Sequence, residues 1–244
     1  MKTRAFTLAE VLITLGIIGV VATLTMPSLI AKYKEKEAVS KLKKIYSTFA
    51  NAYLMAREEQ GTPDNWYSNE GSGTAAAANR MLDVFLPYLK VAKVCKQEQG
   101  CFANVVYKKP DNTNNYNWDT YPNSSRFILS DGTNVFFYSY GSTIRSNGSG
   151  DLAESYGAFS VDINGKAGPN KAGVDLFEFI LTKSGIFPCG TAEATLGSGS
   201  FPEGCNRTSV AGQGEGCTAW VIYNENMDYL HCDGLSWGGK TKCG

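Results

Sequence analysis

The first residue whose chemistry stands out is Glu10, an acid inside a long apolar stretch. Between Ala5 and Ala31 it is the only ionisable side chain. A carboxylate in hydrocarbon costs on the order of a few kcal/mol, and such a residue usually marks a partner or a function. The sequence offers Glu10 no partner within a lone helix. We therefore expect an ion pair with a cation that a second copy of the chain supplies.

A second set of residues offers oxygen ligands for a metal ion. Asp162, Asn164, Asn170 and Asp175 lie in the glycine-containing segment VDINGKAGPNKAGVDLFEF. Calcium takes six to eight oxygens, often from loops rich in Asp and Asn. The segment departs from an EF-hand, because Lys166 stands at a ligand position and the final glutamate is absent. The alternative is a turn in which the Asp and Asn side chains cap their own backbone.

The third set of reactive side chains is the cysteines, which all lie beyond the apolar stretch: Cys95, Cys101, Cys189, Cys205, Cys217, Cys232 and Cys243. The sequence has no Cys-x-x-Cys pair and a single histidine, His231, so a zinc site is not expected. Disulfides in an oxidising compartment are the better interpretation. Cys95 and Cys101 can close a small loop, the other pairings stay open, and one thiol is left over.

Enzymatic chemistry has little support in the sequence. His231 and Cys232 are adjacent, so on a strand their side chains would point to opposite faces. No His-Glu-x-x-His metalloprotease motif occurs. The 23 basic and 23 acidic residues balance, which argues against a broad nucleic-acid-binding surface. We expect no enzyme, and no cofactor apart from the calcium considered above.

The N-terminus also carries a family resemblance. A basic leader with Lys2 and Arg4 precedes Ala5, then Phe6-Thr7-Leu8-Ala9-Glu10, then the apolar stretch. This pattern resembles the class III signal of type IV pilins and type II secretion pseudopilins, although that family usually has glycine where this chain has Ala5. The resemblance implies that a prepilin peptidase cuts between Ala5 and Phe6 and methylates the new amine, and that Glu10 serves assembly. The segment that contains Asp162 and Asp175 also resembles the Asp- and Asn-rich loops of pseudopilin-like proteins, some of which bind calcium.

Two other interpretations explain the N-terminus less well. A Sec signal peptide needs small residues before its cleavage site, but Leu29 stands at the minus-three position before a cut near Ala31. A plain membrane anchor explains the length, since roughly 20 apolar residues span a bilayer as a helix, but gives no reason for Glu10.

The elements that position these residues follow from periodicity. A helix is predicted from Phe6 to Gln60, apolar all round at first and later on one stripe, before the stop signal of Gly61 and Pro63. The stripe consists of Val39, Leu42, Ile45, Tyr46, Phe49, Ala52, Tyr53 and Ala56. A second helix is predicted from Ala75 to Leu86, and strands at residues 127–130, 135–138, 158–163 and 176–181. Residues 108–125 are predicted to be a surface loop.

These elements predict an α+β fold in which a long N-terminal helix packs on an antiparallel sheet, with a Cys-rich C-terminal lobe from Pro188 onward. The resemblance implies that this is the pilin fold. The expected organisation is a leader at 1–5, a transmembrane and assembly helix at 6–30, and an extracytoplasmic domain at 31–244. Aromatic side chains of the lobe, such as Trp237, serve either packing or ligand binding.

The expected function is that of a structural filament subunit. Its partners would be other pilin or pseudopilin subunits, the prepilin peptidase, the inner-membrane assembly platform and the membrane itself. It would lie in the inner membrane as a single-pass protein, with its C-terminal domain in the periplasm or outside, and then in the filament. The lysines after the apolar stretch argue for the opposite orientation, but the cysteines and the resemblance outweigh them. The alternatives are a minor tip subunit that binds a ligand through the Cys-rich lobe, and a membrane-tethered extracytoplasmic protein or enzyme.

Overall fold

The first element of the computed structural model is helix α1, which runs for 53 residues from Leu8 to Gln60. The structure describes residues 7–142, 154–191 and 199–244, so Ala5 and Phe6 lie outside it. The chain divides into two units, Met1–Glu37 and Ala38–Gly244, which are described separately below. Helix α1 ends as predicted. Gly61 adopts a positive φ of 77°, and its amide donates to the carbonyl of Arg57 at 3.0 Å.

In the unit that ends at Glu37, the described chain is helix with an apolar, exposed surface. Leu12, Ile18 and Leu24 are each more than half exposed. By length and composition, α1 is the one helix among the described residues that could cross a membrane. The hydroxyls of Thr14 and Thr23 donate to the carbonyls four residues earlier, at 2.9 and 2.7 Å. These bonds leave few polar groups on the surface of this segment.

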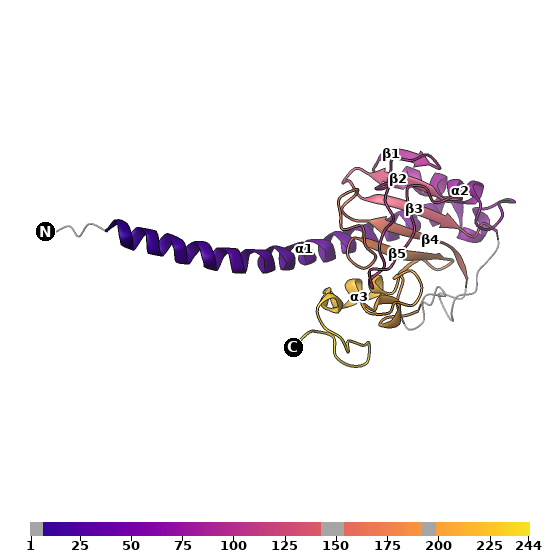
Figure 1. The fold of residues 1–244 in the computed structure, drawn as a ribbon. Coiled ribbons are helices and arrows are strands. Elements are labelled where there is room, and N and C mark those ends of the chain that lie inside the picture. Colours follow the sequence, from indigo (N-terminus) through magenta and orange to yellow (C-terminus); the bar gives the residue numbers. More distant parts are fainter. Residues whose placement is uncertain (1–6, 143–153, 192–198) are drawn as a thin grey trace. The chain divides into compact units, whose positions relative to one another are not determined.

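Within its described residues, the unit that begins at Ala38 contains the second half of α1, helices α2 and α3, and a six-stranded sheet (Figure 1). The elements after α1 are helix α2 (Ala75–Phe85), strands β1 (Val91–Lys96), β2 (Ser125–Leu129), β3 (Asn134–Ser139), β4 (Ser155–Asp162), β5 (Leu176–Thr182) and β6 (Ile186–Pro188), and helix α3 (Cys217–Asn224). The strands pair in sequence order and every neighbouring pair is antiparallel. This confirms the α+β arrangement expected from the sequence.

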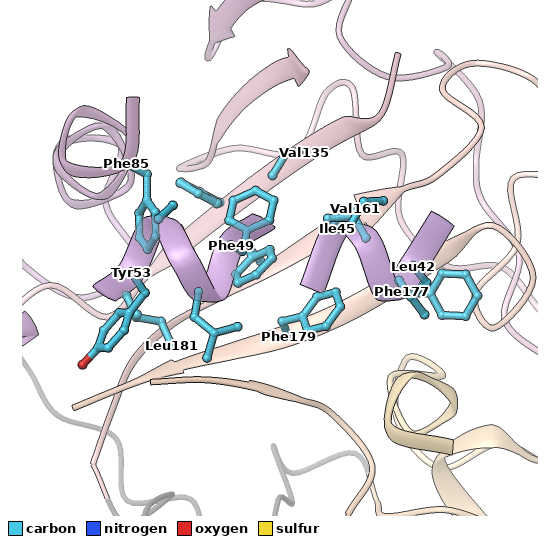
Figure 2. Packing of buried hydrophobic residues seen from close by; sticks show 14 of the residues in the cluster. Leu42, Ile45, Phe49, Tyr53, Phe85, Val135, Val161, Phe177, Phe179 and Leu181 are labelled. Carbon is cyan, nitrogen blue, oxygen red and sulfur yellow. The ribbon is translucent and has the colours of Figure 1, made fainter. Parts of the chain in front are cut away.

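The predicted apolar stripe of α1 forms the centre of the core. Figure 2 shows Leu42, Ile45 and Phe49 against the side chains of the central strands. The ring of Phe49 lies 4.5 Å from the ring of Phe159, and Tyr46 stacks on Phe179 at 5.7 Å. These contacts arise because side chains three and four residues apart share one face of a helix. The face of the sheet that they cover is called the inner face here.

Helix α2 also packs on the inner face. Thr74 caps it by accepting a hydrogen bond from the amide of Ala77 at 3.2 Å. Its last residue, Phe85, lies 5.6 Å from Phe137 on β3 and 6.1 Å from Phe49. The helix stops one residue before the predicted end at Leu86, where a short 3₁₀ turn that contains the predicted breaker Pro87 begins.

The predicted strands are all present, and the hairpin between β2 and β3 is confirmed. Its turn is closed by the amide of Leu129, which donates to the carbonyl of Thr133 at 2.9 Å, and Gly132 supplies the positive φ of 86°. Strands β1 and β6 were not predicted. β1 is a mostly exposed edge strand and β6 has only three residues, so neither carries a strong alternation signal.

Residues 108–125 were predicted to be a surface loop, but part of this segment is buried. Residues 108–124 contain no helix and no strand of the sheet, and β2 begins at Ser125, but Trp118, Asp119 and Ser124 are buried. Trp118 packs on Phe136 of β3 with 4.7 Å between ring centroids. The loop therefore covers the face of the sheet opposite to α1, called the outer face here. Because most residues of the segment are polar, its composition did not reveal the few residues that anchor it.

Candidate functional site

The N-terminal end of α1 forms a capping box around Glu10. The backbone amide of Thr7 donates to Glu10 Oε2 at 2.8 Å, and the Thr7 hydroxyl donates to the same oxygen at 2.9 Å. In return, the Glu10 amide donates to Thr7 Oγ1 at 3.3 Å. This reciprocal arrangement satisfies amides that a helix start leaves without partners.

The capping box corrects one expectation from the sequence. Glu10 was expected to find no partner within its own helix, but Thr7 hydrogen-bonds to it. The pattern Thr-x-x-Glu could have revealed this, because it is the sequence signature of a capping box. Thr7 is neutral, however, so it supplies hydrogen bonds and no counter-charge. The hydrogen bonds from Thr7 therefore do not replace the cation that the expected ion pair of Glu10 requires.

The four predicted calcium ligands are brought together between β4 and β5. Asp162 Oδ1 accepts from the amide of Asn164 at 3.2 Å, and Asp162 Oδ2 accepts from the Tyr107 hydroxyl at 2.6 Å. Asp175 Oδ2 accepts from the amide of Asn170 at 2.8 Å and from Asn164 Nδ2 at 3.3 Å. Its Oδ1 accepts from the amide of Lys171 at 2.6 Å.

Three of these bonds, from the backbone amides of Asn164, Asn170 and Lys171, are those of the turn alternative, in which Asp and Asn side chains cap the backbone. All four carboxylate oxygens of Asp162 and Asp175 already accept hydrogen bonds from protein donors. Among the described residues, no group of three or more His, Cys, Asp or Glu side chains is placed to hold a metal ion. Burial and the nearby Asp175 raise the pKa of Asp162 to about 8. The donor set therefore fits the self-capping turn better than a calcium ion.

The cysteines form three disulfides and leave one thiol. Cys95 pairs with Cys101, as their spacing predicted. Cys205 pairs with Cys217 and Cys232 with Cys243, two pairings that the sequence left open. The remaining thiol is Cys189, which is buried, and burial raises its pKa above the ordinary value. A buried, protonated thiol is a packing residue and a poor nucleophile.

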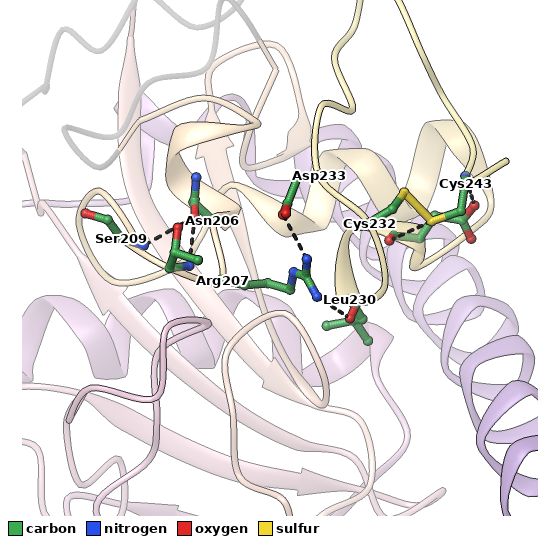
Figure 3. A network of polar contacts seen from close by, with 9 residues as sticks. Asn206, Arg207, Ser209, Leu230, Cys232, Asp233 and Cys243 are labelled. Carbon is green, nitrogen blue, oxygen red and sulfur yellow. Dashed lines mark hydrogen bonds and ion pairs between the residues drawn. A yellow bond between two sulfur atoms is a disulfide. The ribbon is translucent and has the colours of Figure 1, made fainter.

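The C-terminal lobe is held by polar contacts as well as by disulfides (Figure 3). Arg207 donates to the carbonyl of Leu230 at 3.0 Å and to the carboxylate of Asp233 at 2.8 Å. Next to it, Asn206 Oδ1 accepts from the amides of Thr208 and Ser209, at 2.8 and 3.2 Å. These contacts tie a segment of low regular structure to the rest of the lobe.

The aromatic side chains of the lobe serve packing, which was one of the two alternatives. Trp237 lies 5.3 Å from Trp220 and donates its indole N–H to the carbonyl of Gly190 at 3.2 Å. Trp220 is fully buried on α3 and stacks on Phe201 at 3.9 Å. Helix α3 was not predicted, because its eight residues are apolar nearly all round and show no helical period.

Two short catalytic patterns overlap in the lobe at GLSWGGKT, residues 234–241, and were missed in the sequence. Gly-x-Ser-x-Gly marks a nucleophile elbow and Gly-x-x-x-x-Gly-Lys-Thr a phosphate loop. Both patterns need a preceding strand and a following helix. Here the segment folds back on itself, with the amide of Ser236 donating to the carbonyl of Lys240 at 3.0 Å, and no helix or strand follows in the described chain. Neither pattern forms its functional structure.

Comparison with known proteins places most of this chain in one family. Residues 28–185 match the model of a family of unknown function, DUF6613. The match runs from Ser28, within α1, to Gly185, just after β5, and it leaves out the N-terminal capping box and the disulfide-held lobe. No curated protein and no solved structure matches the chain. Because the family model covers well over half of the residues, the chain belongs to the family of unknown function DUF6613.

Proposed function

We propose that the protein is a structural subunit of a filament of the type IV pilus or type II secretion pseudopilus kind. In this proposal a prepilin peptidase cuts between Ala5 and Phe6 and methylates the amine of Phe6. The subunit waits in the inner membrane with its C-terminal domain in the periplasm, and is then transferred to the filament. The fold of the head would be a pilin fold, with α1 on an antiparallel sheet.

The observation that carries the proposal is the change of surface along α1. Its first part is apolar and exposed, while Leu42, Phe49 and Tyr53 of its second part are buried in the head. Exposed apolar surface of this extent marks contact with a membrane or with another protein. A filament supplies both in turn, because a helix can leave lipid for an equally apolar bundle of sister helices.

Glu10 would act in the transfer. In a helical bundle, the positively charged amine of Phe6 of one subunit would approach Glu10 of its neighbour, and the low dielectric would strengthen their attraction. The capping bonds from Thr7 would hold the Glu10 carboxylate near the start of the helix. Removing either charge would strand the other, which is the costly change for a buried pair.

Mass spectrometry of the native N-terminal peptide, with the cysteines left unreduced, tests the proposal. The expected peptide begins with N-methyl-Phe6, and the remaining peptides show the three disulfides of an oxidising compartment. A mature protein that retains Met1 and the five-residue leader would overturn the filament role. The same experiment performed on sheared filaments and on membranes shows where the processed chain resides.

A second candidate function is a membrane-tethered extracytoplasmic protein. The capping box favours it, because Glu10 finds hydrogen-bond donors without any sister chain. A tether keeps an uncut N-terminus and stays in the membrane fraction, so the peptide analysis separates the two. A minor tip subunit shares the processing of the filament subunit and differs in copy number and position, which immunogold labelling of filaments measures.

A further inference from the structure

The C-terminal lobe contains a cavity of about 310 Å³ between two segments that disulfides hold. One wall is formed by residues 205–208 and the other by residues 232–235. Each wall begins at a cysteine, and these two cysteines are bridged to Cys217 and Cys243. The walls are therefore fixed although neither contains a strand or an α-helix. Pockets that bind small molecules range from roughly 300 Å³ upward.

The base of the cavity is apolar. Phe201, Tyr229 and Leu235 line it, and each is at most 4% exposed. Phe201 is held by its stacking on Trp220 at 3.9 Å, and the hydroxyl of Tyr229 donates to the carbonyl of Gly173 at 2.7 Å. The base thus presents an apolar surface whose shape is set before any ligand arrives.

The rim of the cavity carries one positive and one negative charge. Among the described residues that line it, Arg207 and Asp233 are the charged side chains. The guanidinium of Arg207 donates to the Asp233 carboxylate at 2.8 Å and to the carbonyl of Leu230 at 3.0 Å (Figure 3). The bond to Leu230 orients Arg207 independently of Asp233. The cavity is therefore neutral in total, with two opposite charges side by side.

This ion pair can exchange partners at little cost. The side chain of Asp233 is 81% exposed and that of Arg207 is 33% exposed. A pair so open to solvent stabilises a protein by at most about 1 kcal/mol. An arginine has five N–H donors, and Leu230 and Asp233 use two of those of Arg207. Arg207 can thus donate to a further acceptor that enters the cavity.

We propose that this cavity binds a free α-amino acid with an apolar side chain, such as leucine or phenylalanine. Its carboxylate binds the guanidinium of Arg207, since arginine is the side chain best suited to carboxylates. Its ammonium group binds the carboxylate of Asp233. Its side chain packs on the apolar base and is removed from water. One exposed ion pair is thereby replaced by two.

The neighbouring charges of the rim favour this ligand over others. A ligand with a carboxylate alone would be repelled by Asp233, and one with an ammonium alone would be repelled by Arg207. The end of a peptide chain supplies one of the two charges. A free amino acid carries both on the same carbon atom, which suits two side chains that lie in contact.

The test uses the full-length protein in a non-ionic maltoside detergent and isothermal titration calorimetry. L-phenylalanine and L-leucine should show saturable binding. The analogues 3-phenylpropionate and 2-phenylethylamine each lack one charge, and each should bind at least about tenfold more weakly than phenylalanine. No saturation by either amino acid, or equal binding of a singly charged analogue, would overturn the proposal.

Variants locate the binding in this cavity. Asp233→Asn should weaken phenylalanine binding about tenfold, and 3-phenylpropionate should then bind as well as phenylalanine, because the repulsion is gone. Arg207→Gln keeps a donor for the carbonyl of Leu230 and should weaken both ligands about tenfold. Asp83→Asn, the same change at an exposed position on α2, is the matched control and should bind like the natural protein.

Melting curves show that each variant is folded. Unchanged phenylalanine binding in Asp233→Asn and Arg207→Gln would reject the assignment. Glycerophosphoethanolamine, a lipid headgroup whose two charges lie further apart, should bind more weakly than phenylalanine, and tighter binding would overturn the choice of an amino acid. Because the assay involves neither cleavage nor assembly, its outcome is independent of the proposed filament role.

Discussion

Thr7 directs two donors, its amide and its hydroxyl, at the same oxygen of Glu10, at 2.8 and 2.9 Å. The acid in the apolar stretch thus has a local role, which is to close the first turn of α1. The filament proposal gives it a second role as a charge. Conservative variants can separate these two roles, because glutamine keeps the hydrogen-bond acceptor and loses the charge.

The first prediction concerns Glu10→Gln and Glu10→Ala. If Glu10 acts as a charge in the bundle, both variants should be cut and methylated but fail to enter filaments, since neither offers an anion to Phe6 of the neighbour. Immunoblots of sheared filaments and of membranes measure this. Thr7→Val removes the capping hydroxyl and keeps the charge, and it should assemble. Normal incorporation of Glu10→Gln would show that Glu10 acts only as a helix cap.

The second prediction tests the contact between α1 and the sheet. Phe49→Ala should lower the free energy of unfolding by about 3–5 kcal/mol, because the ring is fully buried against Phe159 and Phe85. Chemical denaturation of the full-length protein in detergent measures it. Leu54→Ala, on the exposed side of the same helix, should cost about 0.5 kcal/mol. Similar losses in both variants would mean that the stripe does not anchor α1.

The third prediction concerns Arg126, the buried cation that holds the loop on the outer face. Arg126→Leu should destabilise the protein by about 3 kcal/mol, because the carbonyls of Trp118 and Tyr121 lose their donors. Thermal melts and faster amide exchange at residues 116–121 would report it. Lys166→Leu, an exposed cation on another loop, is the control and should change little. Unaltered amide exchange in the loop would show that Arg126 does not hold it in place.

The fourth prediction is a pH dependence of stability. Asp162 has a pKa of about 8 in the folded protein and an ordinary value of 3.8. Between these values the folded carboxyl holds a proton that the unfolded chain has released. Stability should therefore fall as pH rises from about 4 to about 8. Asp175, whose pKa is also raised, shares this titration.

Urea denaturation across that pH interval checks this prediction. Asp162→Asn should flatten the profile, since asparagine is neutral throughout. Asp83→Asn, an exposed acid on α2, should leave the slope as it is. A natural protein that becomes more stable towards pH 8 would show that Asp162 is ionised in the fold.

The fifth prediction distinguishes the self-capping turn from a calcium loop. Because the oxygens of Asp162 and Asp175 already accept protein hydrogen bonds, 1 mM calcium should shift the melting temperature by less than about one degree. Differential scanning fluorimetry at pH 8, with magnesium as the control, measures this. A rise of several degrees that Asp175→Asn abolishes would establish calcium binding.

The sequence by itself determined the elements that local pattern specifies. The apolar stripe from Val39 to Ala56 gave the second half of α1, the Asp-Gly turn gave the β2–β3 hairpin, and short spacing gave the Cys95–Cys101 bridge. In each case the interacting residues lie within one turn, one hairpin or one short loop. Such contacts leave a periodic or spaced signal in the chain.

Tertiary structure alone decided the rest. The bridge between Cys205 and Cys217, the clamp from Arg126 to the loop at 116–121, and the pairing of Phe136 with Glu178 through Ser160 have no periodic signal. Each depends on the register of neighbouring strands or on how an irregular loop folds onto them. The outer face has a cavity because small side chains on β4 lie between larger side chains on β3 and β5. That juxtaposition is a property of the sheet, and no single strand contains it.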